Sequence, residues 1–247
     1  MNDSNRKSSL STKAYQEILN LIISMRLKPG MQVNTEELEH GLSIGKTPVR
    51  EALLRLANEG LLTSVQGRGF FVRHVSLEDV KSLFETVMIL ERPGVSLAAR
   101  RITTPEILEL SRVNEELGKA MSQGQFLEVT ILNSQFHRII YESVNNTFLT
   151  ASLCNLDSQY RRLAYLCFSK EANANDLDQH FAKVLAGHNE LIDAFEKRDE
   201  AAAVEAITHH VHLFNSRVSL YLYPPVPTYE GIIDSLPMES GKNANHR

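Results

Sequence analysis

The sequence is poor in the features of membrane, secreted and disulfide-stabilised proteins. Only two cysteines occur in 247 residues, Cys154 and Cys167, and these are too few for a disulfide scaffold. Without a CxxC motif, a thiolate metal site is also excluded. No apolar run reaches the roughly 18 residues that a transmembrane helix needs. Because the polar start lacks the apolar core of a secretion signal, we expect a cytoplasmic protein with reduced cysteines.

The short motifs of common enzyme classes are missing as well. No Gly-rich phosphate loop, GxSxG nucleophile elbow or HExxH zinc motif occurs. The remaining composition, 43% hydrophobic and 23% charged, is that of an ordinary globular chain. A length of 247 residues fits one or two domains.

Charge is divided unevenly along the chain. Residues 1–75 contain 10 Lys and Arg against 7 Asp and Glu, a balance of +3. Residues 76–247 contain 16 against 23, a balance of −7. A nucleic-acid partner is therefore compatible with the first part and disfavoured for the second, which predicts two regions with different tasks.

Residues 1–75 predict three helices. Apolar residues recur at helical spacing after Ser11, which can cap the first helix, and Leu27-Lys-Pro-Gly30 ends it. Asn34 and Glu37 have the spacing of a capping box for a short second helix. Thr47-Pro48 supplies an N-cap and a first-turn proline for the third.

A β-hairpin is expected directly after the third helix. The extended runs 61–65 and 70–74 are joined by Gln66-Gly-Arg-Gly69, and they form the only strand pair that the sequence indicates. Three helices followed by a β-wing define a winged helix-turn-helix. We therefore predict a DNA-binding domain over residues 1–75.

The rest of the chain shows helical periodicity only, so the expected fold class is mainly α: a winged helix-turn-helix followed by an all-α antiparallel bundle. The bundle should cover residues 76–223, with a loose C-terminal tail over 224–247. We expect its helices at 77–101, 105–122, 124–143, 146–168, 177–197 and 200–221.

The expected DNA-binding residues lie at the start of the third helix and in the wing. Lys46, Thr47 and Arg50 place two cations beside the backbone N–H groups and the positive end of a helix dipole, which suits a DNA phosphate. Arg50 lies one turn in, where a recognition helix reads base edges. Gly67 and Arg68 belong to a wing that can approach the DNA backbone closely. The alternative is a solvated helix end beside a flexible hairpin.

Three histidines lie on apolar stripes of three different helices. Asn133 and His137 are four residues apart, and hence one turn apart, on one of these stripes. Asp199 lies eleven residues from both His188 and His210, so an antiparallel pairing brings these two to the same level. Three core-facing imidazoles and an amide oxygen match the ligands of a divalent metal such as zinc or nickel. The alternative is a set of hydrogen-bonded core histidines.

Arg161 and Arg162 lie in an apolar helix. One of them could reach inward to pair with the carboxylate of an effector. The alternative is a surface arginine pair.

The N-terminal motifs resemble a known family. The segments Leu27-Lys-Pro-Gly30, Gly45-Lys-Thr-Pro-Val-Arg-Glu-Ala-Leu53 and Glu59-Gly60-Leu-Leu62 are similar to the DNA-binding domain of the GntR superfamily. The resemblance implies that Lys46, Thr47, Arg50 and Gly67 contact operator DNA. The helical remainder resembles the FCD-type effector domain of the FadR subfamily, and the two resemblances together cover about residues 10–222.

The FCD resemblance implies a metal site at the same three histidines. His137, His188 and His210 match the metal-binding histidines of that domain, whereas Asn133 replaces its usual aspartate. Because a neutral amide is a weaker ligand than a carboxylate, we expect the metal to bind less tightly. The site is also one unit more positive, which favours an anionic effector.

The sequence therefore predicts a homodimeric transcription regulator and not an enzyme. Its DNA-binding head would read a palindromic operator, and its helical domain would bind a small organic acid. Two other hypotheses are a helical metal-dependent hydrolase at the three histidines and a metal-free regulator that binds an acyl thioester. The DNA-reading head disfavours the first, and the histidines disfavour the second.

Overall fold

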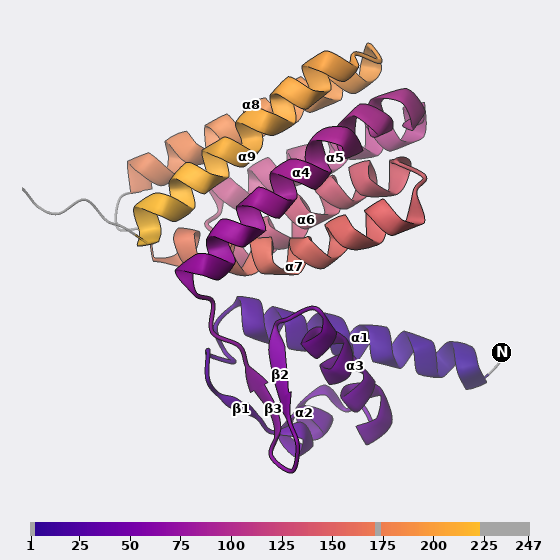
Figure 1. The fold of residues 1–247 in the computed structure, drawn as a ribbon, viewed down its shortest axis with the longest axis vertical. Helices are drawn as coiled ribbons and strands as arrows, with labels where there is room; N and C mark the ends of the chain where they lie inside the picture. Colours follow the sequence, from indigo (N-terminus) through magenta and orange to yellow (C-terminus); the bar gives the residue numbers. More distant parts are fainter. Residues whose placement is uncertain (1–2, 171–173, 223–247) are drawn as a thin grey trace, which may run out of the picture.

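The structure is a computed structural model that describes residues 3–170 and 174–222. Within these residues the chain is mainly helical, with one small sheet near its N-terminus (Figure 1). The predicted fold class is confirmed. The predicted tail over 224–247 lies outside the described residues. No helix in the described ranges is long and apolar enough to cross a membrane.

The N-terminal part, here called the head, consists of three helices and a three-stranded sheet. The sheet is antiparallel in the order β1-β3-β2. The elements are α1 (Asp3–Ile23), β1 (Gln32–Val33), α2 (Thr35–Leu42), α3 (Lys46–Asn58), β2 (Leu62–Val65) and β3 (Gly69–Val72).

Local sequence signals explain the boundaries in the head. The Asn34 side chain accepts hydrogen bonds from the backbone N–H groups of Glu36 and Glu37 at the start of α2, as the capping pattern predicts. Glycine is required in the turn between β2 and β3, because Gly67 and Gly69 have φ of 73° and 83°.

Two predictions in the head need correction. The sequence indicated only a strand pair, but Gln32 and Val33 add a third strand by pairing with Phe71 and Phe70 of β3. A run of two residues is too short to show the alternation of apolar and polar side chains that is typical of a strand. The pairing of these residues therefore depends on the neighbouring hairpin. The first helix also begins at Asp3 and not near Ser11, since no Gly or Pro interrupts residues 3–10.

The C-terminal part of the described chain, residues 77–170 and 174–222, is here called the bundle and consists of six helices packed mostly antiparallel. Their starts are defined by capping residues; for example, Ser76 and Asp79 form a capping box before α4, and Thr103 and Glu106 form another before α5. The helices are α4 (Leu77–Arg101), α5 (Thr104–Ser122), α6 (Phe126–Ser143), α7 (Thr147–Ser169), α8 (Ala174–Glu196) and α9 (Glu200–Leu222).

Head and bundle have separate hydrophobic cores. The head core ends in sequence at Val72, and the bundle core begins at Val80. Helix α7 lies along α1 where the two parts meet (Figure 1). Leu127 of α6 and Tyr165 of α7 pack against the core of the head, so the bundle contacts the head through side chains as well as through the connecting chain.

Candidate effector pocket and DNA-binding surface

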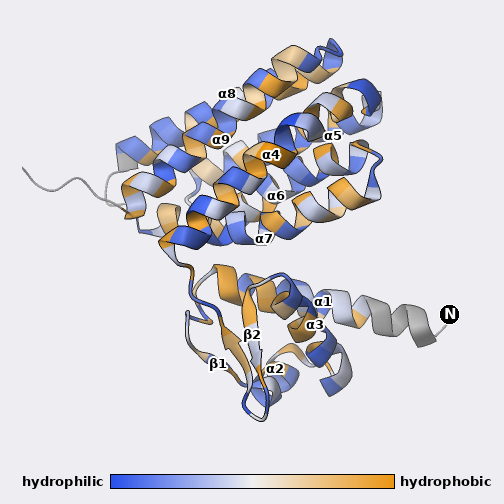
Figure 2. Cartoon of the chain, in the orientation of Figure 1, coloured by the Kyte–Doolittle hydropathy of each residue, from blue (hydrophilic) through white to orange (hydrophobic). Residues whose placement is uncertain are grey.

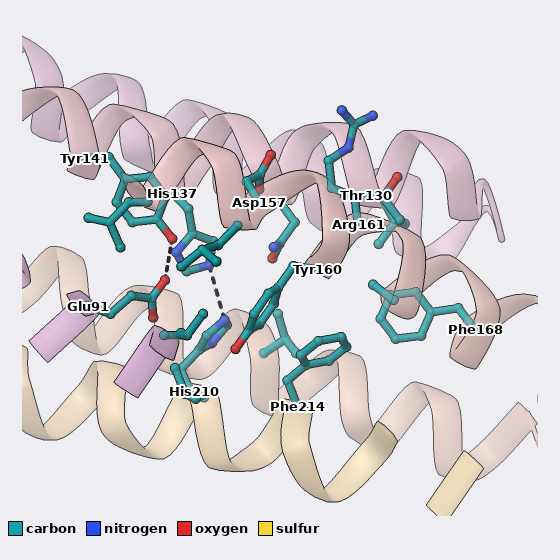
Figure 3. Close-up of a pocket in the computed structure, with 18 of the residues that line it drawn as sticks. Glu91, Thr130, His137, Tyr141, Asp157, Tyr160, Arg161, Phe168, His210 and Phe214 are labelled. Atoms are coloured by element: carbon teal, nitrogen blue, oxygen red, sulfur yellow. Dashed lines mark hydrogen bonds between the residues drawn. The ribbon is translucent and has the colours of Figure 1, made fainter. Parts of the chain in front are cut away.

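The three histidines singled out in the sequence meet inside the bundle. His137 comes from α6, His188 from α8 and His210 from α9, and one ring nitrogen of each lies within 4.8 Å of the other two. The Nε2 atoms of His137 and His210 are 3.2 Å apart, and the two rings point toward one another in Figure 3. The rings of His188 and His210 lie at the same level, with centroids 4.8 Å apart, as the spacing around Asp199 predicts.

Burial keeps these imidazoles neutral. Loss of hydration lowers the pKa of His137 and of His188 well below the usual value, and the neighbouring His210 lowers both further. Burial also lowers the pKa of His210 to about 4. Each ring therefore keeps one nitrogen lone pair near neutral pH, and a lone pair is what a metal ion requires of a ligand.

The hydrogen bonds of the cluster leave ligand atoms available. His188 Nδ1 donates to the side-chain oxygen of Asn114 at 2.9 Å, because an amide oxygen can only accept. This contact leaves the Nε2 lone pair of His188 free, and that atom has no hydrogen-bond partner among the described residues. Asn114 is itself fixed by donating to Asn189 at 2.9 Å. Asn114 thus orients a candidate ligand, the role that outer-shell partners have at metal sites.

A divalent metal fits this donor set. Tetrahedral zinc with Zn–N bonds of about 2.0–2.1 Å places ligand nitrogens about 3.4 Å apart. The 3.2 Å between the Nε2 atoms of His137 and His210 is close to that spacing. Asn133 and these two histidines line one cavity.

The cavity beside the histidines is small, closed and mixed in character. The volume open to the centre of a water molecule is about 60 Å³. This volume exceeds the roughly 10–15 Å³ that a cavity needs to hold one water, so the cavity has room for more than one water-sized group. The aromatic and polar groups that line it include Glu91, Thr130, Asn133, Tyr141, Asp157, Tyr160, Arg161, Phe168, His180 and Phe214 (Figure 3).

A buried carboxyl group lies next to the histidine cluster. The Tyr141 hydroxyl donates a short hydrogen bond to Glu91 Oε1, while Glu91 Oε2 has no partner within the described ranges. Burial raises the pKa of Glu91 to about 7, although the hydrogen bond from Tyr141 opposes the shift. Burial also raises the pKa of Asp157, whose carboxylate accepts a 2.5 Å hydrogen bond from Ser134.

The two arginines occupy different places. Arg161 lines the pocket and donates from Nη2 to Asn20 Oδ1 of α1 at 3.1 Å. Arg162 is only 1% exposed but is not among the residues that line the pocket. The alternative of a surface arginine pair is therefore wrong, because both side chains are buried.

Sequence reasoning missed several pocket residues. His180 is not one of the three predicted histidines, yet it lines the pocket, and burial lowers its pKa to about 4. Its spacing of eight residues from His188 is a signal that could have found it, since both lie on one face of α8. Glu91, Asp157 and Asn114 gave no such signal, because polar residues at helix positions are usually solvated.

The predicted DNA-binding residues lie on the surface of the head. Lys46, Thr47 and Arg50 are exposed in the first turns of α3, and Gly67 and Arg68 are exposed in the turn between β2 and β3. Figure 2 shows this turn as a hydrophilic tip, and in Figure 1 it points away from the bundle. The Arg68 backbone oxygen accepts a 2.6 Å hydrogen bond from Gln32, which ties the wing to β1.

A head with a winged helix-turn-helix and a bundle with an internal pocket lined by polar and apolar groups define the class of ligand-responsive DNA-binding proteins. Comparison with known families agrees with this class. The model of bacterial regulatory proteins of the gntR family matches residues 10–72, and the FCD domain model matches residues 82–213. The chain belongs to the GntR family of transcription regulators with an FCD domain.

Individual relatives are transcription regulators as well. The chain is 28% identical over 185 residues to the Nta operon transcriptional regulator of Aminobacter aminovorans, covering 74% of this chain and 83% of the relative. It is 25% identical over 198 residues to the HTH-type transcriptional regulator YdhC of Bacillus subtilis, covering 79% and 85%. The solved structure of E. coli McbR/YncC has the same fold, with a TM-score of 0.73 at 22% identity over 86% of this chain and 97% of that one.

These relationships decide between the functional hypotheses. The protein is a DNA-binding transcription regulator and not an enzyme. The hydrolase and acyl-thioester alternatives are not favoured.

Proposed function

We propose that this regulator binds operator DNA through residues 1–75 and a small organic acid through residues 76–223. The observation that carries the proposal is the closed pocket in the FCD domain, which joins a neutral histidine cluster to a buried arginine. Such a pocket suits a small polar ligand, because several polar atoms of its lining residues have no hydrogen-bond partner among the described residues.

In the head, Lys46 and Thr47 would bind a phosphate at the N-terminus of α3, and Arg50 would read a base edge in the major groove. Gly67 and Arg68 would contact the DNA backbone from the wing. Their exposure at the surface of the head supports these assignments.

In the bundle, His137, His188 and His210 would hold a divalent metal such as zinc or nickel, with Asn133 as a weak fourth ligand. The metal would supply positive charge and open coordination positions for an effector carboxylate. Its charge, together with the neutral amide of Asn133, makes the pocket attractive to an anion. We assign a further effector contact to Arg161 and not to Arg162, because only Arg161 lines the pocket.

We further propose that the protein is a cytoplasmic homodimer that binds a palindromic operator. A single head reads only a few base pairs, and helix-turn-helix proteins commonly gain specificity through two-fold symmetry. Sedimentation with and without DNA tests this proposal, and a protein that stays monomeric at micromolar concentration in both cases would contradict it.

The main experiment isolates the operator and then adds candidate effectors. DNA selected by the purified protein from a genomic pool is sequenced, and the affinity for the recovered site is measured with and without succinate, malate and citrate. We expect one DNA motif and a change in affinity with at least one acid. Failure to enrich any motif would contradict operator binding, whereas an affinity unaffected by all three acids would contradict the proposed effector class.

A further inference from the structure

Helix α7 separates the pocket from the head and contacts both. One of its faces contributes Asp157, Tyr160 and Ala164 to the pocket. Another face contacts the head through Ser158 and Tyr165. A shift of a residue on the pocket side of α7 is therefore passed to the head across the width of one helix.

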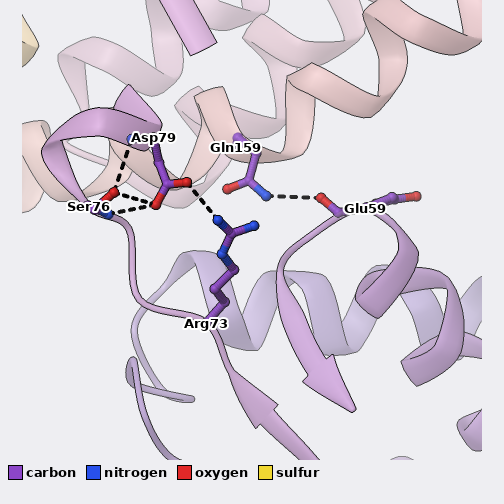
Figure 4. Close-up of polar contacts among 5 residues, drawn as sticks. All are labelled: Glu59, Arg73, Ser76, Asp79 and Gln159. Carbon is purple, nitrogen blue, oxygen red and sulfur yellow. Dashed lines mark hydrogen bonds and ion pairs between the residues drawn. The ribbon is translucent and has the colours of Figure 1, made fainter. Parts of the chain in front are cut away.

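The contacts between α7 and the head involve the end of the recognition helix. Gln159 Nε2 donates to the backbone oxygen of Glu59, the C-cap residue of α3, at 3.0 Å (Figure 4). The Glu59 carboxylate accepts hydrogen bonds from Tyr15 of α1 at 2.6 Å and from Ser158 at 3.3 Å. Helix α7 thus positions α1 and α3 together.

Arg161 lies between the two faces of α7. At about 100° per residue, it projects between the line of Tyr160 and Ala164 and the line of Ser158 and Tyr165. Its stem lines the pocket, while its guanidinium points away from His137 and His210 in Figure 3 and donates to Asn20 of α1. Arg161 therefore contacts the pocket and the head with one side chain.

The guanidinium of Arg161 is incompletely paired. The side chain is buried, and its Nε has no hydrogen-bond partner in the part of the chain that the structure describes. Burial lowers its pKa, and Asp157, one turn earlier on α7, is the first of the charged groups that oppose this shift. A buried cation with an unused donor is a favourable partner for an entering carboxylate.

The unused donor lies on the same edge of the guanidinium as the contact to the head. Nε and Nη2 form the edge on which an arginine binds a carboxylate side-on with two hydrogen bonds. Asn20 Oδ1 accepts a hydrogen bond from Nη2, whereas Nε has no hydrogen-bond partner among the described residues. Nη2 carries two N–H groups, so a carboxylate on this edge shares Nη2 with Asn20. Because the guanidinium points away from His137 and His210, drawing it toward an acid in the pocket breaks the contact to Asn20.

We propose that an effector carboxylate and Asn20 compete for Arg161, and that this competition transmits effector binding to the head. The inference rests on the proposed function, in which a small organic acid enters the pocket. With the pocket unfilled by an acid, Arg161 ties α1 to α7. A bound carboxylate draws the guanidinium inward, breaks the bond to Asn20 and frees the head to take another position relative to the bundle.

Substitutions at Asn20 test the competition from outside the pocket. Asn20→Ala removes the competitor, so succinate, malate or citrate should bind severalfold more tightly by calorimetry. Asn20→Asp gives Arg161 a charged partner, which should weaken binding of the same acid about tenfold. Lys13→Gln, an exposed change on α1 that alters the net charge by the same amount as Asn20→Asp, is the control and should leave the affinity unchanged.

A fluorescent reporter tests whether the head moves. Because the sequence contains no tryptophan, Tyr165→Trp introduces a single one where α7 packs against the core of the head. Saturation with the bound acid should move its emission to longer wavelength as the contact opens. In the background of Asn20→Ala, part of that change should be present before any acid is added.

The outcomes separate this inference from the proposed function. Opposite shifts in acid affinity at Asn20 support the competition. Equal affinities for the wild type and both Asn20 variants would overturn the competition without contradicting the carboxylate pocket. The same conclusion would follow if saturating acid did not change the tryptophan emission. If none of the three acids binds the wild type, the effector class and the competition both fail.

Discussion

Head and bundle place their candidate functional polar groups in opposite environments. In the head, Lys46, Arg50 and Arg68 are exposed at the surface. In the bundle, His137 and His188 are buried, and burial is the main cause that lowers their pKa values well below the usual value. An exposed set suits a large polyanion such as DNA, whereas a buried set suits a small ligand that replaces water completely.

This difference implies that ligand binding in the two parts depends on different contributions to the free energy. The surface cations of the head act through charge and are screened by salt. The buried groups of the bundle act through desolvation, so removing one of them should affect metal, effector and stability together. Substitutions in the two parts test whether charge dominates in the head and desolvation in the bundle.

The largest effect is expected for His188→Ala. It removes one of three candidate ligands, so metal affinity should fall by more than about 100-fold while the head stays folded. Elemental analysis of protein purified without chelator or affinity tag, and then exposed to zinc or nickel, gives the measurement. Wild type and variant that are equally free of metal would contradict the metal assignment.

Glu91→Gln should change how stability depends on pH. The pKa of Glu91 is raised from 4.5 to about 7 in the folded protein, so between these pH values only the folded state keeps the proton and the free energy of unfolding of the wild type falls as pH rises. The variant should therefore gain stability over the wild type as pH rises from 5 to 8, by about 3 kcal/mol at 1.36 kcal/mol per pKa unit. Urea unfolding of both proteins at several pH values measures this gain, and a constant difference would refute it.

Arg50→Ala should weaken operator binding by about 1–3 kcal/mol per half-site if Arg50 reads a guanine. Because the side chain is exposed, the free energy of unfolding should hardly change. Fluorescence anisotropy with the recovered operator checks the affinity. Unchanged affinity in a correctly folded variant would remove α3 from the role of recognition helix.

The smallest effect is expected for Asn133→Asp. A carboxylate is a stronger ligand than an amide, so metal binding should tighten by about tenfold. The added negative charge should also weaken an anionic effector. Competition with a chelator measures the first change and calorimetry the second; if metal affinity does not respond, Asn133 is not a ligand.

Much of the candidate site could be predicted because its residues follow one helix period. His137, His188 and His210 each interrupt an apolar stripe, and the equal spacing of His188 and His210 from Asp199 places them at one level. His180 shares the stripe of His188 and could have been included. The third strand could not be predicted, since Gln32 and Val33 are strand residues only because β3 lies beside them.

Most helix ends, the winged helix-turn-helix and the three histidines could be predicted from the sequence, because these depend on capping residues, local motifs and periodicity; the start of α1 could not. Helix packing decides which polar residues lie together. Glu91 and Asp157 line the pocket from separate helices, Asn114 contacts His188 from a third, and nothing local distinguishes these three from solvated residues. The position of Arg161 between pocket and head likewise arises from packing, because its partner Asn20 is 141 residues away in the chain.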